Sequence, residues 1–193
     1  MLFGDDLIPR LEDLFRAMDS AYSGAAARVG FTCKGCDGAK CCTVDLIVHT
    51  FLEMSILCRG FETLDADTKG EVLNRCRSLV RAKEENPTGD AYRNSVCVLN
   101  FDGHCVLYEC RPMICRLAGI PHVILRPDGR TSTGEGCETY RKEIQPANPD
   151  LELDRTDFYR KMAEIETEVV RRMGERTVPL TIGEILFRHG HSA

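Results

Sequence analysis

Long apolar runs and an excess of basic residues are missing from this sequence, and we expect no secretory leader. No stretch approaches the roughly 20 consecutive apolar residues that a membrane-spanning helix requires. The N-terminal segment MLFGDDLIPRLEDLF is acidic and amphipathic, and it lacks the basic start of a signal peptide. With 25 Lys and Arg against 30 Asp and Glu, the net charge of −5 disfavours nucleic acid as the main partner. We therefore expect a cytoplasmic protein without membrane or nucleic-acid contacts, and leave a protein partner open.

Several familiar site motifs are missing as well. The chain has one Cys-x2-Cys pair, Cys33 and Cys36, whereas a zinc ribbon of two such knuckles needs two. No run matches the bacterial ferredoxin pattern of three closely spaced cysteines with a later Cys-Pro. The sequence also has no Gly-rich loop between a strand and a helix, of the kind that holds a nucleotide cofactor.

Cysteine itself is abundant, with 11 residues in a chain of 193. Disulfides are rare in a reducing compartment, so this abundance indicates metal binding or redox chemistry, and an odd count weakens a complete disulfide framework. Four of the thiols lie in the segment CKGCDGAKCC, residues 33–42. Cys33 and Cys36 have the spacing by which a tight turn directs two sulfurs at one ion. Gly35 and Gly38 suit a loop whose backbone amides approach sulfur. We interpret this segment as a thiolate metal-binding loop.

The length and composition are those of one soluble domain with a core of its own. We expect an α+β fold, a helix-rich single domain over residues 1–193 with short β-hairpins around a cysteine metal site. Residues 31–137 would form the cysteine-cluster core, and residues 1–30 and 150–193 would form helical flanks.

Helices are predicted from apolar positions at helical spacing and from capping signals. Thr50 with Glu53 and Thr181 with Glu184 have the spacing of capping boxes, and Gly60 is expected to end the helix that Thr50 opens. We expect His189 and His191 to lie in a disordered tail. The predicted helices cover about residues 6–27, 51–60, 67–85, 154–173 and 184–190, with a short helix after Pro112.

Strands are predicted at three places. Alternation over residues 44–48 indicates a short strand. Residues 95–99 and 104–108 would form a hairpin across an Asp-Gly turn, and residues 122–133 a second hairpin around Pro127-Asp128-Gly129.

The cysteines divide by their setting. Cys58 and Cys76 fall in apolar helical stretches and are expected to be small buried hydrophobes. The other nine lie in loops, on hairpins or at a helix start. Tetrahedral centres take four sulfurs, so eight ligands would serve two sites, with Cys110 as the spare. The eight candidate ligands are Cys33, Cys36, Cys41, Cys42, Cys97, Cys105, Cys115 and Cys137. Thiolate coordination indicates an iron–sulfur cluster, with 4Fe-4S as the first choice, or Zn2+.

The segments CKGCDGAKCC and CVLYECRPMICR, with Cys97 between them and a later cysteine, closely resemble the CxxCxxCC cysteine-cluster family, also called YkgJ-like. The resemblance spans about residues 31–137, although four residues separate Cys36 from Cys41 where the family's name implies two. Members of this family are regarded as zinc- or iron-chelating proteins, so the resemblance implies metal binding. In the second segment, the residues that follow the family's pattern are Cys105, Tyr108, Arg111, Pro112, Cys115 and Arg116.

Three classes of function follow. The first is an iron–sulfur protein with a redox, sensing or accessory role, and the second is a zinc-stabilised structural or interaction module. The third is a lysine N-methylase-like enzyme, because some proteins related to the family are lysine N-methylases. We expect Arg111 and Arg116 to donate hydrogen bonds to the cofactor's sulfurs, the alternative being ordinary salt bridges to neighbours such as Glu109. Tyr108 is expected in the core.

Overall fold

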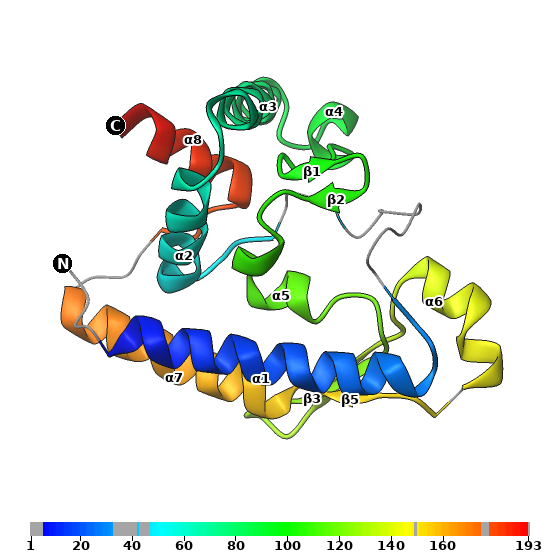
Figure 1. Cartoon of the computed structure of the whole chain (residues 1–193). Helices are drawn as coiled ribbons and strands as arrows, with labels where there is room; N and C mark the ends of the chain where they lie inside the picture. The colour runs from blue at the N-terminus through cyan, green and yellow to red at the C-terminus, as the bar shows by residue number, and fades with distance from the viewer. Residues whose placement is uncertain (1–5, 33–41, 43–46, 149, 175–177, 193) are drawn as a thin grey trace. The chain divides into compact units, whose positions relative to one another are not determined.

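The computed structural model describes residues 6–32, 42, 47–148, 150–174 and 178–192. Its contacts divide the chain into two compact units, each built from two stretches of sequence. Unit 1 consists of Met1–Cys41 and Met113–Arg176, and unit 2 of Cys42–Pro112 and Thr177–Ala193. Helices dominate and the sheets are small, so the predicted helix-rich α+β fold is confirmed (Figure 1). The extent of the predicted domain, residues 1–193, stays a prediction.

Unit 1 is organised around two long helices that pack together, α1 (Leu7–Arg28) and α7 (Thr156–Met173). A short helix, α5 (Met113–Arg116), also packs against α1. The sheet has the order β4-β3-β5, in which β3 pairs antiparallel with β4 and parallel with β5. Its strands are β3 (His122–Leu125), β4 (Thr131–Gly134) and β5 (Leu153–Asp154). Helix α6 (Glu138–Glu143) and the 3-10 turn η3 (Gln145–Ala147) connect β4 to β5.

The long helices of unit 1 have the apolar face and, for α7, the glycine end that the sequence predicts. Leu7, Leu11 and Met18 of α1 are fully buried, and Val169 is fully buried on α7, so each helix presents one apolar face to the core. Helix α7 ends at Gly174, whose φ of +76° is the left-handed conformation that glycine adopts without strain.

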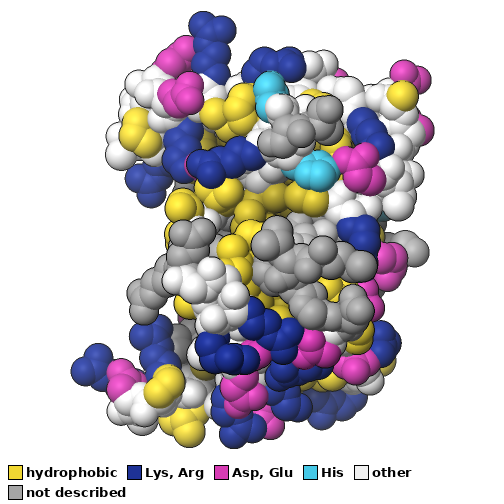
Figure 2. Space-filling view, turned by 90° about the vertical axis from the view of Figure 1, so that its left-hand side faces the viewer, with side chains coloured by type: hydrophobic (Ala, Val, Ile, Leu, Met, Phe, Trp, Pro, Cys, Tyr) yellow, Lys and Arg dark blue, Asp and Glu magenta, His cyan; other side chains and the backbone are white. Residues whose placement is uncertain are grey.

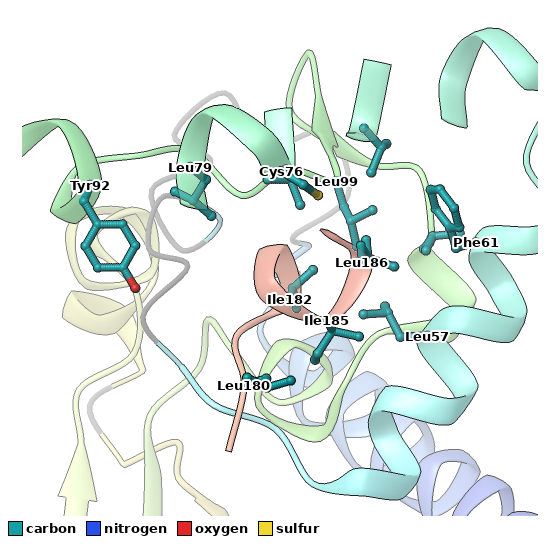
Figure 3. Packing of buried hydrophobic residues seen from close by; sticks show 13 residues of the cluster. Leu57, Phe61, Cys76, Leu79, Tyr92, Leu99, Leu180, Ile182, Ile185 and Leu186 are labelled. Carbon is teal, nitrogen blue, oxygen red and sulfur yellow. The ribbon is translucent and has the colours of Figure 1, made fainter. Parts of the chain in front are cut away.

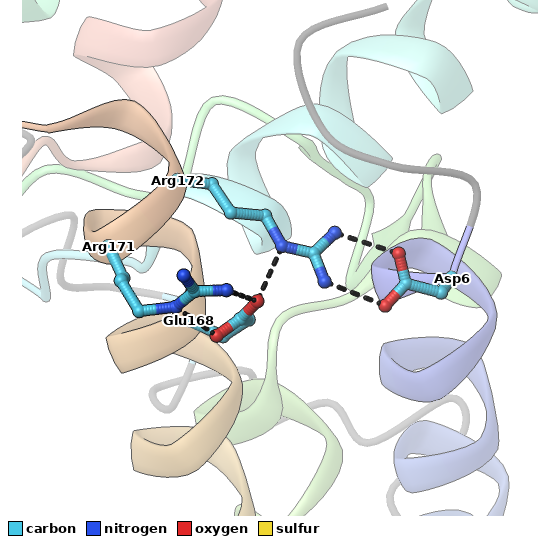
Figure 4. A network of polar contacts seen from close by, with 4 residues as sticks. All are labelled: Asp6, Glu168, Arg171 and Arg172. Carbon is cyan, nitrogen blue, oxygen red and sulfur yellow. Dashed lines mark hydrogen bonds and ion pairs between the residues drawn. The ribbon is translucent and has the colours of Figure 1, made fainter.

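Asp6 precedes α1 without a side-chain capping hydrogen bond. Its carboxylate instead accepts two hydrogen bonds from Arg172 at 2.7 and 2.9 Å, tying the start of α1 to the end of α7. Arg171 and Arg172 both donate to Glu168 (Figure 4). On the face shown in Figure 2, acidic side chains lie among basic ones.

Unit 2 packs α2 (Phe51–Glu62) and α3 (Ala66–Glu85) against α8 (Ile182–Ser192). Between α3 and the end of its first stretch, unit 2 forms a short helix, a two-stranded hairpin and a 3-10 turn. These are α4 (Asp90–Arg93), β1 (Asn100–Phe101), β2 (His104–Cys105) and η2 (Tyr108–Cys110). The buried core includes Leu57 of α2, Cys76 of α3 and Ile185 of α8, which gather in Figure 3.

Both predicted capping boxes of unit 2 are confirmed. Glu53 N–H donates to Thr50 Oγ1, and the Glu53 carboxylate accepts from the Thr50 backbone N–H at 3.0 Å. Thr181 and Glu184 repeat this reciprocal pair at α8. Each box satisfies backbone donors that the first turn of a helix leaves without intrahelical acceptors.

Several local predictions were wrong. Helix α2 continues through Gly60 to Glu62, so Gly60 does not end it. The strands of the hairpin predicted over residues 95–108 are only two residues each. Its Asp102-Gly103 turn is present, with φ of +51° and +81°. His189 and His191 lie in α8, where His189 Nε2 is 2.6 Å from a Glu62 carboxylate oxygen.

The predicted strand over 44–48 lies largely outside the described residues. Nearby, His49 makes an isolated antiparallel bridge with Leu180. In the described part of the chain, no helix is both long and apolar enough to cross a membrane.

Candidate metal-binding site

The predicted cysteine ligands are distributed over both units. Cys42, Cys97 and Cys105 belong to unit 2, and Cys115 and Cys137 to unit 1. Cys33, Cys36 and Cys41 lie outside the described residues. The eight described cysteines are present as thiols, not disulfides, as metal ligation requires.

In unit 2, a backbone hydrogen bond joins two cysteines that are far apart in the sequence. The Cys97 N–H donates to the Cys42 carbonyl oxygen at 2.6 Å. This contact places the last residue of the cysteine-rich segment beside the residues that lead into the β1–β2 hairpin. The bond belongs neither to the internal pattern of a helix nor to a paired strand, so it is a specific tertiary contact.

Cys105 ends β2, and Cys110 ends the 3-10 turn that follows. Burial raises the pKa of the Cys105 thiol, and the nearby Cys110 thiol adds to that effect, whereas the positive charge of Arg111 opposes it. The Arg111 guanidinium lies 3.4 Å from the centre of the Tyr108 ring, and its Nε donates to the Tyr108 carbonyl at 2.7 Å. Arg111 is therefore held where its charge acts on a predicted ligand.

Cys110, the predicted spare, packs against a glycine of α2. A Cβ at Gly60 would lie 2.4 Å from Cys110 Sγ and 3.0 Å from Cys110 Cβ, and real Cβ atoms do not approach so closely. Gly60 is thus where η2 and α2 come into contact, which is why it lies inside the helix rather than at its end.

In unit 1, Cys137 is the N-cap residue of α6 and its Sγ accepts a hydrogen bond from the Tyr140 N–H at 3.4 Å. Its own N–H donates to the Gly119 carbonyl at 2.9 Å, in the loop that follows Cys115. The sequence reading missed this capping role, because cysteine is not among the usual N-cap residues.

A ring contact connects the start of the cysteine-rich region to α6. The rings of Phe31 and Tyr140 meet edge to face with centroids 5.3 Å apart, and both residues are buried. In the sequence, Phe31 comes two residues before Cys33 and Tyr140 three residues after Cys137.

The two arginines predicted to bind the cofactor have different surroundings. Arg116 is 5% exposed, forms an ion pair with Asp19 of α1 and lies 4.2 Å from the centre of the Phe15 ring. An ordinary salt bridge to an acidic neighbour is the alternative to the cofactor role, and the one that Arg116 forms is to Asp19. The cofactor role of both arginines stays a prediction. Tyr108 is 39% exposed, so its assignment to the core was wrong.

The two cysteines assigned to apolar packing occupy such positions. Cys76 is fully buried in the core of unit 2, and Cys58 packs against that core from α2. Burial raises the pKa of Cys58 to about 11, so this thiol stays protonated near neutral pH.

The described residues on their own do not complete a metal site. Among them, no group of three or more His, Cys, Asp or Glu side chains is arranged to hold a metal ion. In comparisons of the chain with family models, with curated proteins and with solved structures, nothing matched. The resemblance to the CxxCxxCC family therefore stays a prediction.

Proposed function

We propose that this protein binds one or two metal centres through cysteine thiolates, with a 4Fe-4S cluster as the first candidate and Zn2+ as the alternative. The observation that carries the proposal is the hydrogen bond from the Cys97 N–H to the Cys42 carbonyl. This bond brings Cys42, the last of four cysteines in residues 33–42, beside Cys97, a fifth cysteine 55 residues later in the sequence.

The chemistry of the donors supports an iron–sulfur cluster or zinc. Thiolates are soft ligands that suit both, whereas magnesium and calcium require oxygen. The proposed ligands are the eight cysteines predicted from the sequence, five of which are described and occur as thiols. A reducing cytoplasm, which we propose as the location, keeps such thiols available.

The setting of Cys105 is compatible with a redox-active cluster as well as with a zinc site. Arg111 lies close enough to Cys105 for its charge to oppose the rise in the pKa of that thiol. A guanidinium beside a cluster offsets the negative charge of the thiolates and tunes the reduction potential. The corresponding role would be electron transfer, sensing or an accessory function in one of these processes.

The test is elemental analysis of anaerobically purified protein for iron, zinc and acid-labile sulfide, together with an absorption spectrum. Iron with matching sulfide and broad visible absorption would establish the cluster. Stoichiometric zinc in a colourless protein would establish the alternative. Protein prepared with both metals supplied that retains neither would refute the proposal.

Single cysteine variants then test the assignment. Cys97→Ser is expected to lower metal content, because it removes a proposed ligand. Cys76→Ala is the matched control and keeps full metal content, at a cost of about 1 kcal/mol in packing. Equal metal content in the two variants would contradict the assignment of Cys97.

A further inference from the structure

Two loops of unit 1 approach each other more closely than side chains would permit. A Cβ at Gly136 would lie 2.8 Å from the Gly119 carbonyl oxygen and 3.1 Å from the Ile120 carbonyl carbon. Gly136 also has a φ of +82°, a conformation that L side chains rarely adopt. Glycine is therefore needed here for two reasons, and the approach lets the Cys137 N–H reach the Gly119 oxygen at 2.9 Å.

Arg155 holds the same loop through different atoms. Its side chain is buried, with 2% of the residue exposed. Its Nη2 donates to the Leu117 carbonyl oxygen and, at 3.3 Å, to the Ile120 carbonyl oxygen. The backbone N–H of Arg155 donates to Val123 of β3 at 2.9 Å, which fixes the base of the side chain to the sheet. The loop that follows Cys115 is thus held by Arg155 and also by Cys137.

We propose that Cys115 and Cys137 are ligands of the same metal centre, and that Gly136 and Arg155 are the positioning residues that hold this pair ready. The inference rests on the proposed function and adds which cysteines share a centre. Cys115 lies four residues before Gly119 in the sequence, and Cys137 is hydrogen-bonded to Gly119. Ligands fixed by their surroundings before the metal arrives bind it more tightly, because less conformational freedom is lost on binding.

The chain offers a matched pair of glycines for the test. Gly129 has a φ of +80°, nearly equal to that of Gly136, but a Cβ there would meet no atom within 4 Å. Gly129→Ala and Gly136→Ala therefore both place an L side chain at a positive φ of about 80°, and only the second forces the loops apart. Metal-free wild type and both variants are titrated anaerobically with Co2+, whose thiolate charge-transfer absorption reports how many sulfurs bind it. Hydrogen exchange of the Cys137 amide is measured on the same samples.

Gly136→Ala is expected to raise the Co2+ dissociation constant about 10- to 100-fold over that of Gly129→Ala, the usual effect of losing a ligand's support. It also lowers the charge-transfer intensity per bound cobalt and removes protection of the Cys137 amide. Equal affinity and intensity in the two variants would overturn the inference and leave the proposed function standing. A folded wild-type protein that binds no Co2+ would overturn the inference, and the proposed function falls as well if that protein retains neither iron nor zinc when both are supplied.

A second pair of variants covers the case in which Gly136→Ala fails to fold. Arg155→Lys keeps the positive charge but loses the planar fork that reaches two carbonyl groups. Arg172→Lys changes an arginine of α7 that pairs with Asp6 and Glu168, away from the loops in question. We expect weaker Co2+ binding and lower charge-transfer intensity in Arg155→Lys alone. Unchanged binding in Arg155→Lys would overturn the assignment of Arg155 as a positioning residue.

Discussion

Replacing Gly60 with alanine should destabilise unit 2, although alanine is the better helix former. In an exposed helix interior, this substitution stabilises by about 1 kcal/mol. At Gly60 the new methyl group would lie 2.4 Å from Cys110 Sγ, 3.0 Å from Cys110 Cβ and 3.6 Å from Leu107 Cδ2. Overpacking of this kind costs about 1–3 kcal/mol. The net effect is a loss of up to about 2 kcal/mol in the free energy of unfolding.

Gly70 provides the control, since it lies within α3 and a Cβ there would meet no atom within 4 Å. Gly70→Ala should stabilise the protein by about 1 kcal/mol, so the two variants should differ by about 1–3 kcal/mol. Urea unfolding under reducing conditions, at equal metal loading, measures this difference from the midpoints at constant slope.

The double variant identifies the atom responsible. Adding Cys110→Ala to Gly60→Ala removes the Sγ atom from the contact, and we expect part of the lost stability to return. The reasoning is refuted if Gly60→Ala is as stabilising as Gly70→Ala, or if Cys110→Ala has the same effect with and without the alanine at position 60.

Three further predictions concern acid, capping and thiol reactivity. Hydrogen bonds from Arg171 and Arg172 lower the pKa of Glu168 to about 2 from 4.5. The contribution of Glu168 to stability is therefore present above pH 4.5 and is lost as the pH falls toward 2. Glu168→Gln should make the free energy of unfolding in urea depend less on pH over this range, and an unchanged dependence would contradict the prediction. Thr181→Ala should cost about 1 kcal/mol by removing the cap of α8, and equal unfolding midpoints would show that the cap contributes nothing. Because burial raises the pKa of Cys58 to about 11, iodoacetamide at pH 7.5 should label it far more slowly than a model thiol, as peptide mass spectrometry can check.

Features that depend on neighbouring residues in the sequence were predictable. The Thr50–Glu53 and Thr181–Glu184 boxes are three-residue signals, and both are present. The Asp102-Gly103 turn follows from the tolerance of these residues for positive φ. The burial of Cys76 followed from the apolar spacing of its helix.

Features that depend on contacts between distant segments were not predictable. Gly60 reads as a helix end in the sequence, but its role is set by Cys110, and nothing between the two residues signals this contact. The site shows the same limit. The type and spacing of the cysteines identified them as candidate ligands. The hydrogen bond between Cys137 and Gly119 arises only from tertiary structure, and so does the hydrogen bond by which Arg155 holds the same loop.

The interleaving of the two units has a consequence for how the chain folds as it is synthesised. Helix α1 leaves the ribosome before α7, the partner of its apolar face, and all of the first stretch of unit 2 lies between them in the sequence. At about 5–20 residues per second, α1 waits on the order of ten seconds for that partner. Chains arrested before α7 should therefore need a chaperone to remain unaggregated, and unit 1 should acquire its fold only after α7 has been synthesised.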